Sequence, residues 1–154
     1  MNKLNHVAFI MDGNGRWGKK KKRGRNYGHL EGVKTVEKIV QSSLKLKIPI
    51  ITFYVFSTEN WKRPKKEINF LFNLIGSYFK KEIDNVIKNG IKINIFGSTS
   101  SFSSPLKKVL KETIKKTIKN RKLTVNLALN YGSKNEIKNA FTKIKKRRSK
   151  ITVS

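Results

Sequence analysis

Short apolar segments alternate with amphipathic segments along the chain, and this alternation predicts the fold. The predicted strands are His6–Met11, Ile50–Phe56, Ile91–Phe96 and Leu123–Leu129. The predicted helices are His29–Lys47, Glu67–Lys88, Pro105 to about Asn120, and Asn135–Arg148. The order β-α-β-α-β-α-β-α is typical of an α/β parallel sheet flanked by helices. Because the strand segments are continuously apolar, we expect both faces of the sheet to be covered.

The second predicted helix has a broader apolar face than packing on a sheet requires. Its apolar positions are Phe70, Leu71, Leu74, Ile75, Tyr78, Phe79, Ile83, Val86 and Ile87. The chain contains no recognisable linker and no internal repeat. We therefore predict a single domain over residues 1–154.

Lys and Arg outnumber Asp and Glu by 36 to 9, and the net charge of +27 predicts an anionic partner. Charge alone suits RNA, DNA, acidic lipid headgroups or a polyanionic small molecule. The absence of cysteine excludes disulfides and thiolate chemistry and favours the reducing cytoplasm. No segment resembles a signal peptide or approaches the roughly 18 apolar residues of a membrane span, so we expect a soluble or peripheral protein.

Two unusual loops follow predicted strands, where parallel sheets bind their ligands. In the first loop, Gly13–Gly18 formally matches the dinucleotide pattern G-x-G-x-x-G. The bulky Arg16 and Trp17 before the third glycine, and the lysine run after it, argue against that interpretation. The loop fits a phosphate better, because glycine N–H groups can approach its oxygens, Arg16 can bind them and Asp12 can hold a divalent cation.

Arg25 and His29 lie four residues apart where a helix is expected to begin, so both can face one anion. We interpret His6 as a structural group at the start of a strand. The consecutive cations Lys19–Arg23 fit a solvated surface segment.

The second loop, Ser57–Pro64, combines hydroxyls, a carboxylate, an amide, an indole and a guanidinium. We interpret Asn60 and Arg63 as site residues. Pro64 and Glu67 fit the first turn of the following helix instead.

Three segments, in order and at matching spacing, carry a resemblance to a known family. They are His6–Trp17 (HVAFIMDGNGRW), then Arg25 with Gly28, His29 and Gly32, and then Phe56–Pro64 (FSTENWKRP) with Glu67. Weaker matches are Gly97–Thr99 and Asn130–Gly132. Over residues 6 to 140 the chain resembles the cis-prenyltransferases, the undecaprenyl diphosphate synthase family.

The resemblance implies a Mg²⁺-dependent prenyltransferase with an undecaprenyl diphosphate synthase-like fold. Such an enzyme condenses isopentenyl diphosphate with an allylic diphosphate of the farnesyl diphosphate type. Its product is a Z-polyprenyl diphosphate, the carrier lipid for bacterial cell-wall synthesis. The resemblance also implies a homodimer in the cytoplasm, peripheral to the inner face of the membrane, with no nucleic acid partner. The broad apolar face at Phe70–Ile87 would line the tunnel for the growing hydrocarbon.

The resemblance further implies the roles of individual residues. Asp12 would hold Mg²⁺ and assist departure of the allylic diphosphate, and Asn60 matches the position associated with proton removal. The implied substrate-binding residues are Gly13, Asn14, Gly15, Arg16, Trp17, Arg25, His29, Ser57, Thr58, Glu59, Trp61 and Arg63.

The sequence departs from the family after Tyr131. The family's later Arg-x-x-Gly-Gly and Arg-x-Ser-Asn-Phe segments and a following glutamate do not appear, and a basic run, Lys145–Lys150, lies near the end. In the family these groups bind isopentenyl diphosphate and complete the metal site. Because the segments that carry them are missing, we expect the last strands and the C-terminal part of the domain to be absent. That absence would leave an exposed sheet edge.

Two alternatives to an active prenyltransferase remain open. One is an inactive truncated remnant, or a heteromer subunit, that binds only the allylic diphosphate. The other is a basic RNA-binding module, which is less favoured because RNA-binding sheets expose aromatic side chains and the aromatics here lie in apolar segments.

Overall fold

The computed structural model describes residues 4–151, and it describes side chains up to Lys145. The rest of the predicted basic run, Lys146–Lys150, therefore lies outside the described side chains. The elements in chain order are β1 (His6–Ile10), α1 (Asn14–Lys20), α2 (Gly24–Lys45), β2 (Ile50–Ser57), the 3-10 helix η1 (Thr58–Lys62), α3 (Lys65–Lys88), β3 (Ile91–Phe96), α4 (Ser104–Thr117), β4 (Leu123–Tyr131) and α5 (Ser133–Ile151).

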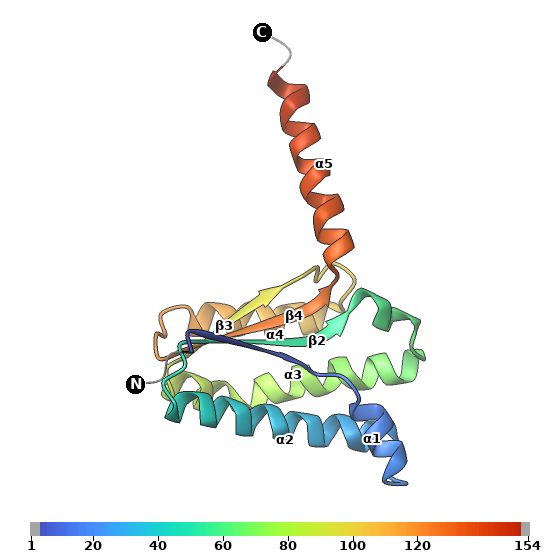
Figure 1. Ribbon diagram of the computed structural model, residues 1–154, viewed down its shortest axis with the longest axis vertical. Helices are drawn as coiled ribbons and strands as arrows, with labels where there is room; N and C mark the ends of the chain where they lie inside the picture. Colours follow the sequence, from blue (N-terminus) through green and yellow to red (C-terminus); the bar gives the residue numbers. More distant parts are fainter. Residues whose placement is uncertain (1–3, 152–154) are drawn as a thin grey trace.

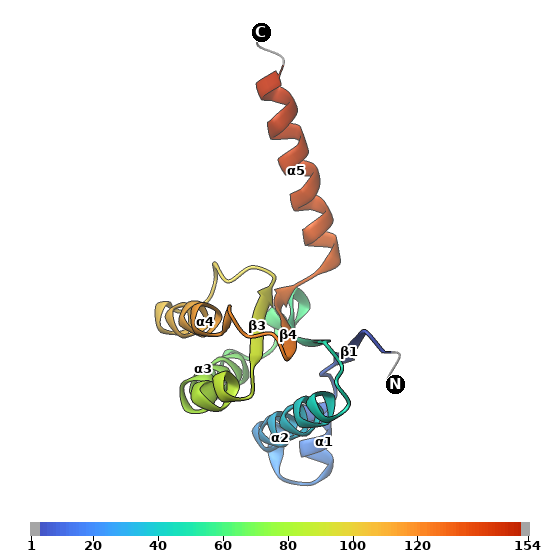
Figure 2. The same cartoon turned by 90° about the vertical axis from the view of Figure 1, so that its left-hand side faces the viewer.

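The strands form one parallel sheet in the order β1-β2-β4-β3. This arrangement confirms the predicted α/β fold. Helices α2 and α3 run side by side along one face of the sheet, and α5 projects away from the opposite side (Figures 1 and 2).

The hydrophobic core lies between the sheet and the helices α2, α3 and α4. Ile51, Phe53 and Leu123 are fully buried, and Phe56 and Leu129 are 1% exposed. Each fully buried side chain of this kind contributes about 1.5–3 kcal/mol of transfer free energy. The two central strands thus supply the most deeply buried side chains, and they fix the positions of the loops that follow them.

The opposite face of the sheet carries a row of polar side chains that crosses all four strands. His6 Nε2 lies 2.7 Å from Thr52 Oγ1, and the Asn126 amide donates to the same hydroxyl at 3.1 Å. Asn94 in turn donates to Asn126 Oδ1 at 3.1 Å. His6 is therefore a structural group, as its position predicted.

The expectation of a sheet covered on both faces is wrong for the described residues. Strand β2 alternates between more and less buried positions, which is typical of a sheet covered on one face. Strand β1 was expected to be buried, but it is the terminal strand, and Ile10 is 80% exposed. Apolar composition alone did not reveal this placement.

The other terminal strand, β3, is covered at its edge by α4 and the turn that follows. The Ile93 N–H donates to Thr117 Oγ1 at 3.2 Å, and the Asn120 amide donates to the Ile91 carbonyl at 2.7 Å. Side chains therefore replace the hydrogen bonds that a further strand would make.

Residues 14–20 form helix α1, where the glycines predicted a loop, whereas Lys19–Arg23 are exposed as predicted. Helix α2 also begins at Gly24, five residues before the predicted start. The two helices pack closely because a Cβ at Gly18 would lie 2.2 Å from the Gly24 carbonyl oxygen, and a Cβ at Gly28 would lie 1.9 Å from that of Asn14. Tertiary packing thus outweighs the low helix propensity of glycine.

The described helices provide no candidate for a membrane-spanning segment, since none is both long and apolar enough.

Candidate functional site

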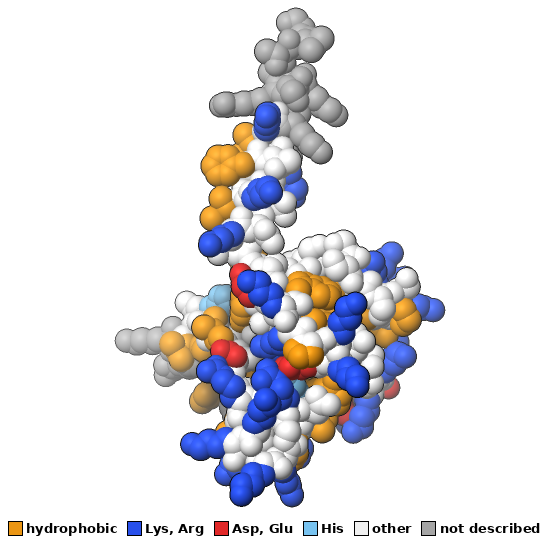
Figure 3. Space-filling model, turned by 90° about the vertical axis from the view of Figure 1, so that its right-hand side faces the viewer, with side chains coloured by type: hydrophobic (Ala, Val, Ile, Leu, Met, Phe, Trp, Pro, Cys, Tyr) orange, Lys and Arg blue, Asp and Glu red, His pale blue; other side chains and the backbone are white. Residues whose placement is uncertain are grey.

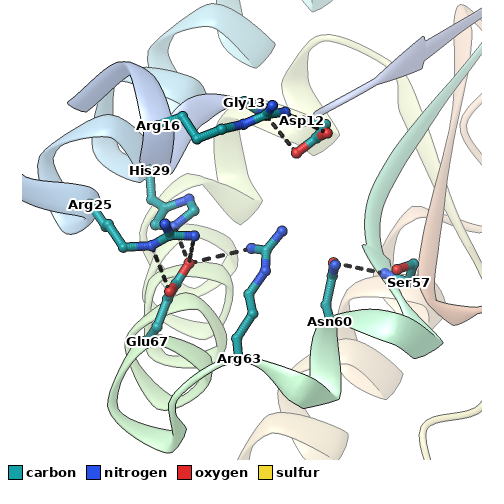
Figure 4. A network of polar contacts seen from close by, with 9 residues as sticks. All are labelled: Asp12, Gly13, Arg16, Arg25, His29, Ser57, Asn60, Arg63 and Glu67. Atoms are coloured by element: carbon teal, nitrogen blue, oxygen red, sulfur yellow. Dashed lines mark hydrogen bonds and ion pairs between the residues drawn. The ribbon is translucent and has the colours of Figure 1, made fainter. Parts of the chain in front are cut away.

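A small polar pocket lies where β1 ends and where α2 and α3 begin. It encloses about 240 Å³ and is lined by Met11, Asp12, Gly13, Asn14, Gly15, Arg16, Arg25, His29 and Arg63. Eight of these nine residues are sequence-predicted site residues. The fold therefore brings together the first loop, the start of α2 and the end of the second loop (Figure 4).

Glu67, in the first turn of α3, is the centre of the hydrogen bonds beside this pocket. Its carboxylate is 6% exposed and accepts two hydrogen bonds from Arg25, from Nε at 2.7 Å and from Nη2 at 3.0 Å. His29 Nε2 lies 3.1 Å from Glu67 Oε1, and Arg63 Nη1 lies 3.4 Å from the same oxygen. Figure 4 shows these side chains converging on one carboxylate.

The surroundings shift the pKa values of Glu67 and His29 downward. Burial by itself would raise the pKa of Glu67, but the hydrogen bonds from Arg25 and His29 and the charges of Arg25 and Arg63 outweigh it and lower that pKa. Burial lowers the pKa of His29 below its ordinary value, although Glu67 acts in the opposite direction. At neutral pH the carboxylate is charged and the imidazole is neutral.

The protonation state of His29 follows from its contact with Glu67. A carboxylate only accepts hydrogen bonds, so the neutral imidazole carries its proton on Nε2 and donates it to Glu67. Nδ1 is then an acceptor. Glu67 neutralises about one of the two arginine charges beside the pocket, and a net positive charge remains there to attract an anion.

Asp12 and Arg16 form an ion pair at the mouth of the pocket. Arg16 Nη2 lies 3.0 Å from Asp12 Oδ2, and their side chains are 75% and 61% exposed. The Gly13 N–H donates to Asp12 Oδ1 at 2.6 Å. Both charged groups remain accessible to a ligand, and solvent weakens their mutual attraction.

The pocket fits a metal ion only if a ligand supplies part of the coordination. The described residues contain no group of three or more His, Cys, Asp or Glu side chains that could enclose a metal. Mg²⁺ is nevertheless commonly held by one or two carboxylates together with substrate phosphates and water. Asp12, exposed at the mouth of the pocket, suits that arrangement.

Ser57 and Asn60 form the cap of η1. Asn60 Oδ1 accepts the Ser57 N–H at 3.1 Å, and the Ser57 side chain accepts the Asn60 N–H in return. Figure 4 shows both residues at the end of β2, beyond Arg63 as seen from Glu67. They do not line the polar pocket, and their mutual hydrogen bonds define the turn that carries Arg63.

The remaining predicted residues of η1 contact the neighbouring elements. Trp61 donates its Nε1–H to Asn130 at 2.7 Å and packs against Phe56, Phe72 and Phe102. Thr58 lies so close to Gly132 that a Cβ there would be 2.4 Å from the threonine hydroxyl. Glu59 is exposed, and hydrogen bonds from its own backbone and from the Ser57 hydroxyl lower its pKa.

Trp17, another predicted substrate-binding residue, lies on the outer side of α1. Its ring stacks on Tyr27 with 5.8 Å between centroids, and it does not line the pocket.

A separate cleft lies between α2, α3 and the sheet. It measures about 1300 Å³ including space that is open to solvent. Its apolar lining includes Val36, Val40, Tyr78, Phe79, Ile93 and Leu127, and its polar lining comprises Glu37, Gln41, Lys81, Glu82, Asn85 and Asn89. On α2, Val40 lies 11 residues after His29, which corresponds to about 16 Å at 1.5 Å per residue. The cleft thus runs along the same pair of helices that begin at the polar pocket. Tyr78, Phe79 and Val86 of the predicted apolar face of α3 line this cleft, and the role of that face as a hydrocarbon tunnel stays a prediction.

Sequence reasoning underestimated Glu67, which it placed only in a helix first turn. The residue does occupy that turn, but its side chain is buried and contacts three cationic or imidazole groups. The spacing of Arg63 and Glu67, four residues apart across the helix start, was an available signal. The contacts with Arg25 and His29 span 42 and 38 residues, and no local pattern shows them.

Comparisons with known proteins give a consistent result. Residues 10–154 match the family model described as "Putative undecaprenyl diphosphate synthase". The isoprenyl transferase of Helicobacter pylori is 44% identical over 140 residues, which is 91% of this chain and 60% of that protein. The isoprenyl transferase of Shouchella clausii is 47% identical over 142 residues, covering 92% of this chain and 55% of that protein.

Two solved structures share the fold. A probable undecaprenyl diphosphate synthase from Campylobacter jejuni has a TM-score of 0.76 at 31% identity, over 96% of this chain and 64% of that one. Lavandulyl diphosphate synthase from Lavandula x intermedia, in complex with dimethylallyl diphosphate, has a TM-score of 0.87 at 25% identity, over 93% and 61%. This chain spans about 60% of the length of such relatives.

Proposed function

Because this chain belongs to the undecaprenyl diphosphate synthase family, we propose that it binds an allylic diphosphate and takes part in transfer of the prenyl group to isopentenyl diphosphate. The observation that carries the proposal is the pairing of a cationic pocket with an apolar cleft along the same two helices. An allylic diphosphate has the same two parts, a polyanionic head and a hydrocarbon tail. The dimethylallyl diphosphate bound to the lavandulyl diphosphate synthase belongs to this substrate class.

The pocket residues would bind the diphosphate by charge and by hydrogen bonds. The backbone of Gly13–Gly15 lets N–H groups approach phosphate oxygens, and Arg16, Arg25 and Arg63 supply guanidinium donors. When the allylic C–O bond breaks, the electron pair leaves with the diphosphate. Fixed positive groups at this position stabilise the charge that develops on the leaving group.

Asp12 is the residue that would hold Mg²⁺, in combination with diphosphate oxygens. A bound Mg²⁺ supplies additional neutralisation of the leaving group. The Gly13 N–H and Arg16 orient the Asp12 carboxylate toward the pocket mouth. An approaching diphosphate can compete for Arg16, which would free carboxylate oxygens for the metal.

Asn60 supports the site by holding its turn in place. Its Oδ1 accepts the Ser57 N–H, so its amide nitrogen is left to donate toward a diphosphate or a water molecule. A neutral amide is a weak base, and the proton released when the new double bond forms would pass to such a diphosphate or water.

Several finer features belong to the same proposal. We take farnesyl diphosphate as the starter and a Z-polyprenyl diphosphate, the carrier lipid of cell-wall synthesis, as the product. A cytoplasmic homodimer at the inner face of the membrane is the assembly that we infer from the family. The length of the cleft, which continues to Asn85 and Asn89 near the end of α3, supports a long hydrocarbon.

One observation favours a second candidate function, binding of the allylic diphosphate without turnover. Asp12 is the only carboxylate that lines the described polar pocket, since Glu67 is buried behind it in its contacts with Arg25 and His29. A second diphosphate and its metal would need further groups. A chain with this pocket alone would bind one substrate and depend on additional residues for transfer.

The test incubates the purified chain with Mg²⁺, farnesyl diphosphate and radiolabelled isopentenyl diphosphate, and separately measures farnesyl diphosphate binding by calorimetry. We expect Asp12→Ala to abolish label in extracted lipid, whereas Asp84→Ala, which removes an exposed carboxylate of α3, retains it. Binding without label, lost in Arg25→Ala, would establish the second candidate. Neither label nor binding would contradict both.

A further inference from the structure

The hairpin formed by α1 and α2 ends in a surface that combines exposed aromatic rings with consecutive cations. We refer to Trp17, Lys19–Arg23, Tyr27 and Leu30 as the hairpin tip. Lys19, Lys20, Lys21, Lys22 and Arg23 are all exposed, and Trp17 and Leu30 are each 43% exposed. Residues 16–30 contain no Asp or Glu. Figure 3 shows Lys and Arg side chains gathering around the lower end of the face where α1 lies.

The aromatic rings and the cations of the tip form one layered cluster. Trp17 and Tyr27 stack at 13° between their planes. Lys21 Nζ lies 5.9 Å from the centre of the Trp17 ring, and Arg23 Cζ lies 4.9 Å from the centre of the Tyr27 ring. Cations over aromatic faces are held in place by the ring quadrupole, so positive charge is fixed beside an apolar surface.

The tip is preformed rather than loosely attached. Gly18 and Gly28 bring the two helices together so closely that a Cβ at either position would meet backbone atoms at 2.2 Å or less. The cations at Lys19–Arg23 take part in none of the ion pairs found among the described residues. Their charge is therefore available to a partner outside the chain.

We propose that the hairpin tip docks on an anionic lipid surface. Amphipathic rings such as indole and phenol favour the interface between water and hydrocarbon, and adjacent lysines are attracted to acidic headgroups. Because the tip carries only positive charges, an anionic partner complements it. An apolar cluster with a rim of exposed lysines fits a lipid interface, into which the exposed Trp17 and Leu30 can insert.

Single-stranded RNA is the other polyanion that basic and aromatic residues attract. Bases bind such proteins by stacking on open aromatic faces. At the tip the two rings stack on each other and a cation lies over each ring, so a base that stacks there would have to displace one of these contacts. The geometry therefore favours lipid over RNA.

Docking would place the polar pocket close to the headgroup layer. Arg16 of the pocket and Trp17 of the tip are neighbours on α1, and Arg25 and Tyr27 lie within the first turn of α2. The docking deepens the membrane location given under the proposed function and rests on it, but it is measured without any substrate. Failure of one proposal can therefore be told apart from failure of the other.

The experiment measures partitioning of the full chain onto phosphatidylcholine vesicles with and without phosphatidylglycerol. The tip variant is Lys19→Gln, Lys20→Gln, Lys21→Gln and Lys22→Gln combined. The matched control changes four exposed lysines of α4, Lys107, Lys108, Lys111 and Lys115, to Gln, so that both proteins lose the same charge. Thermal melts check that both variants fold.

We expect the tip variant to lose at least about tenfold in partitioning onto acidic vesicles, because each lysine near an anionic surface contributes roughly fivefold. The control should change less than about twofold. Equal losses in the two variants would overturn the proposal, since they would show that only total charge matters.

A second measurement follows Trp17 fluorescence in a Trp61→Phe background. We expect a blue shift and quenching by brominated acyl chains when acidic vesicles are added, because the indole enters the lipid interface. An unchanged spectrum with vesicles would overturn the proposal. Quenching of Trp17 by an RNA oligonucleotide but not by vesicles would also overturn it, in favour of nucleic acid.

Discussion

Glu67 determines the arrangement of three pocket side chains although it does not line the pocket itself. Its carboxylate joins Arg25 and His29 of α2 to Arg63 at the end of η1. Two arginines brought close together repel each other, and the buried carboxylate between them compensates that repulsion. The position of the guanidinium groups relative to Gly13–Gly15 therefore depends on a residue that does not line the pocket.

Replacing Glu67 with glutamine should destabilise the protein and weaken diphosphate binding together. The change leaves Arg25 without its charged partner, and breaking a buried ion pair costs about 3 kcal/mol. Thermal and urea unfolding measure the first effect, and farnesyl diphosphate calorimetry measures the second. Glu112→Gln, at an exposed position of α4, is the control and should leave both unchanged. An unaltered unfolding free energy in Glu67→Gln would contradict the role of this carboxylate.

The lowered pKa values of Glu67 and His29 predict how the stability of the protein depends on pH. A lowered pKa of Glu67 means that its contribution is present above its ordinary value of 4.5 and is lost as pH falls below it. A lowered pKa of His29 means that protonation favours the unfolded state, so stability also falls as pH drops below 6.5. Unfolding free energies measured from pH 7 to pH 4 should therefore decrease throughout.

In Glu67→Gln the two parts of the pH dependence should separate. The loss below pH 4.5 should shrink, whereas the loss that starts near pH 6.5 should persist or grow, because Glu67 no longer supports the protonated imidazole. A variant with the same pH dependence as the unmodified chain would show that other groups control it.

At the scale of elements, glycine contacts hold α1 against α2. A Cβ at Gly28 would lie 1.9 Å from the Asn14 carbonyl oxygen, whereas a Cβ at Gly76 in α3 would meet Leu106 Cδ1 at 3.5 Å, an ordinary contact. Because Gly28 and Gly76 are both helical, a comparison of their alanine variants separates the effect of close packing from that of helix propensity.

Gly28→Ala should destabilise the protein by more than about 2 kcal/mol, because overpacking forces backbone shifts between α1 and α2. Gly76→Ala should be neutral or stabilise by up to about 1 kcal/mol, because alanine favours a helix. Chemical denaturation measures both changes. Gly28→Ala should also weaken diphosphate binding, since α1 carries Arg16. Similar unfolding free energies for the two variants would contradict this account.

The elements that sequence predicted well are those whose pattern is local. The alternation of strands and helices, the boundaries of α3 and β3, and the start of α4 near Pro105 all follow from apolar spacing and helix-start residues. Helix α1 was missed because its glycines reflect contacts with α2. The exposure of β1 was missed because strand order depends on pairings between distant segments.

The candidate site was predictable to the extent that its residues cluster in two loops. Asp12–Arg16, Arg25, His29 and Arg63 meet in one pocket, as their positions after strands and at helix starts indicate. Trp17 and Trp61 were both predicted to bind substrate. In the structure Trp17 lies on the hairpin tip, whereas Trp61 lies in an aromatic cluster with Phe72. Only the folded arrangement distinguishes them.

At the scale of the whole molecule, charge is unbalanced. With a net charge of +27 the folded chain repels itself, and salt should relieve that repulsion. Raising NaCl from about 0.05 M to about 0.5 M shortens the Debye length from roughly 14 Å to roughly 4 Å, and we expect the Tm to rise by ~5 °C. Differential scanning calorimetry measures the shift. KCl should act like NaCl, and a decrease of Tm with both salts would contradict the expectation.

The two edges of the described sheet differ in what they offer to another chain. Thr117 and Asn120 already occupy backbone groups along β3, whereas β1 ends the sheet on the other side. Within the described residues, β1 is therefore the edge strand whose outer side no other strand covers, and it is the more open of the two edges to a contact that lengthens the sheet. Two molecules that join β1 to β1 around a two-fold axis use up both available edges, so growth by this route stops at a pair and cannot continue into a fibre.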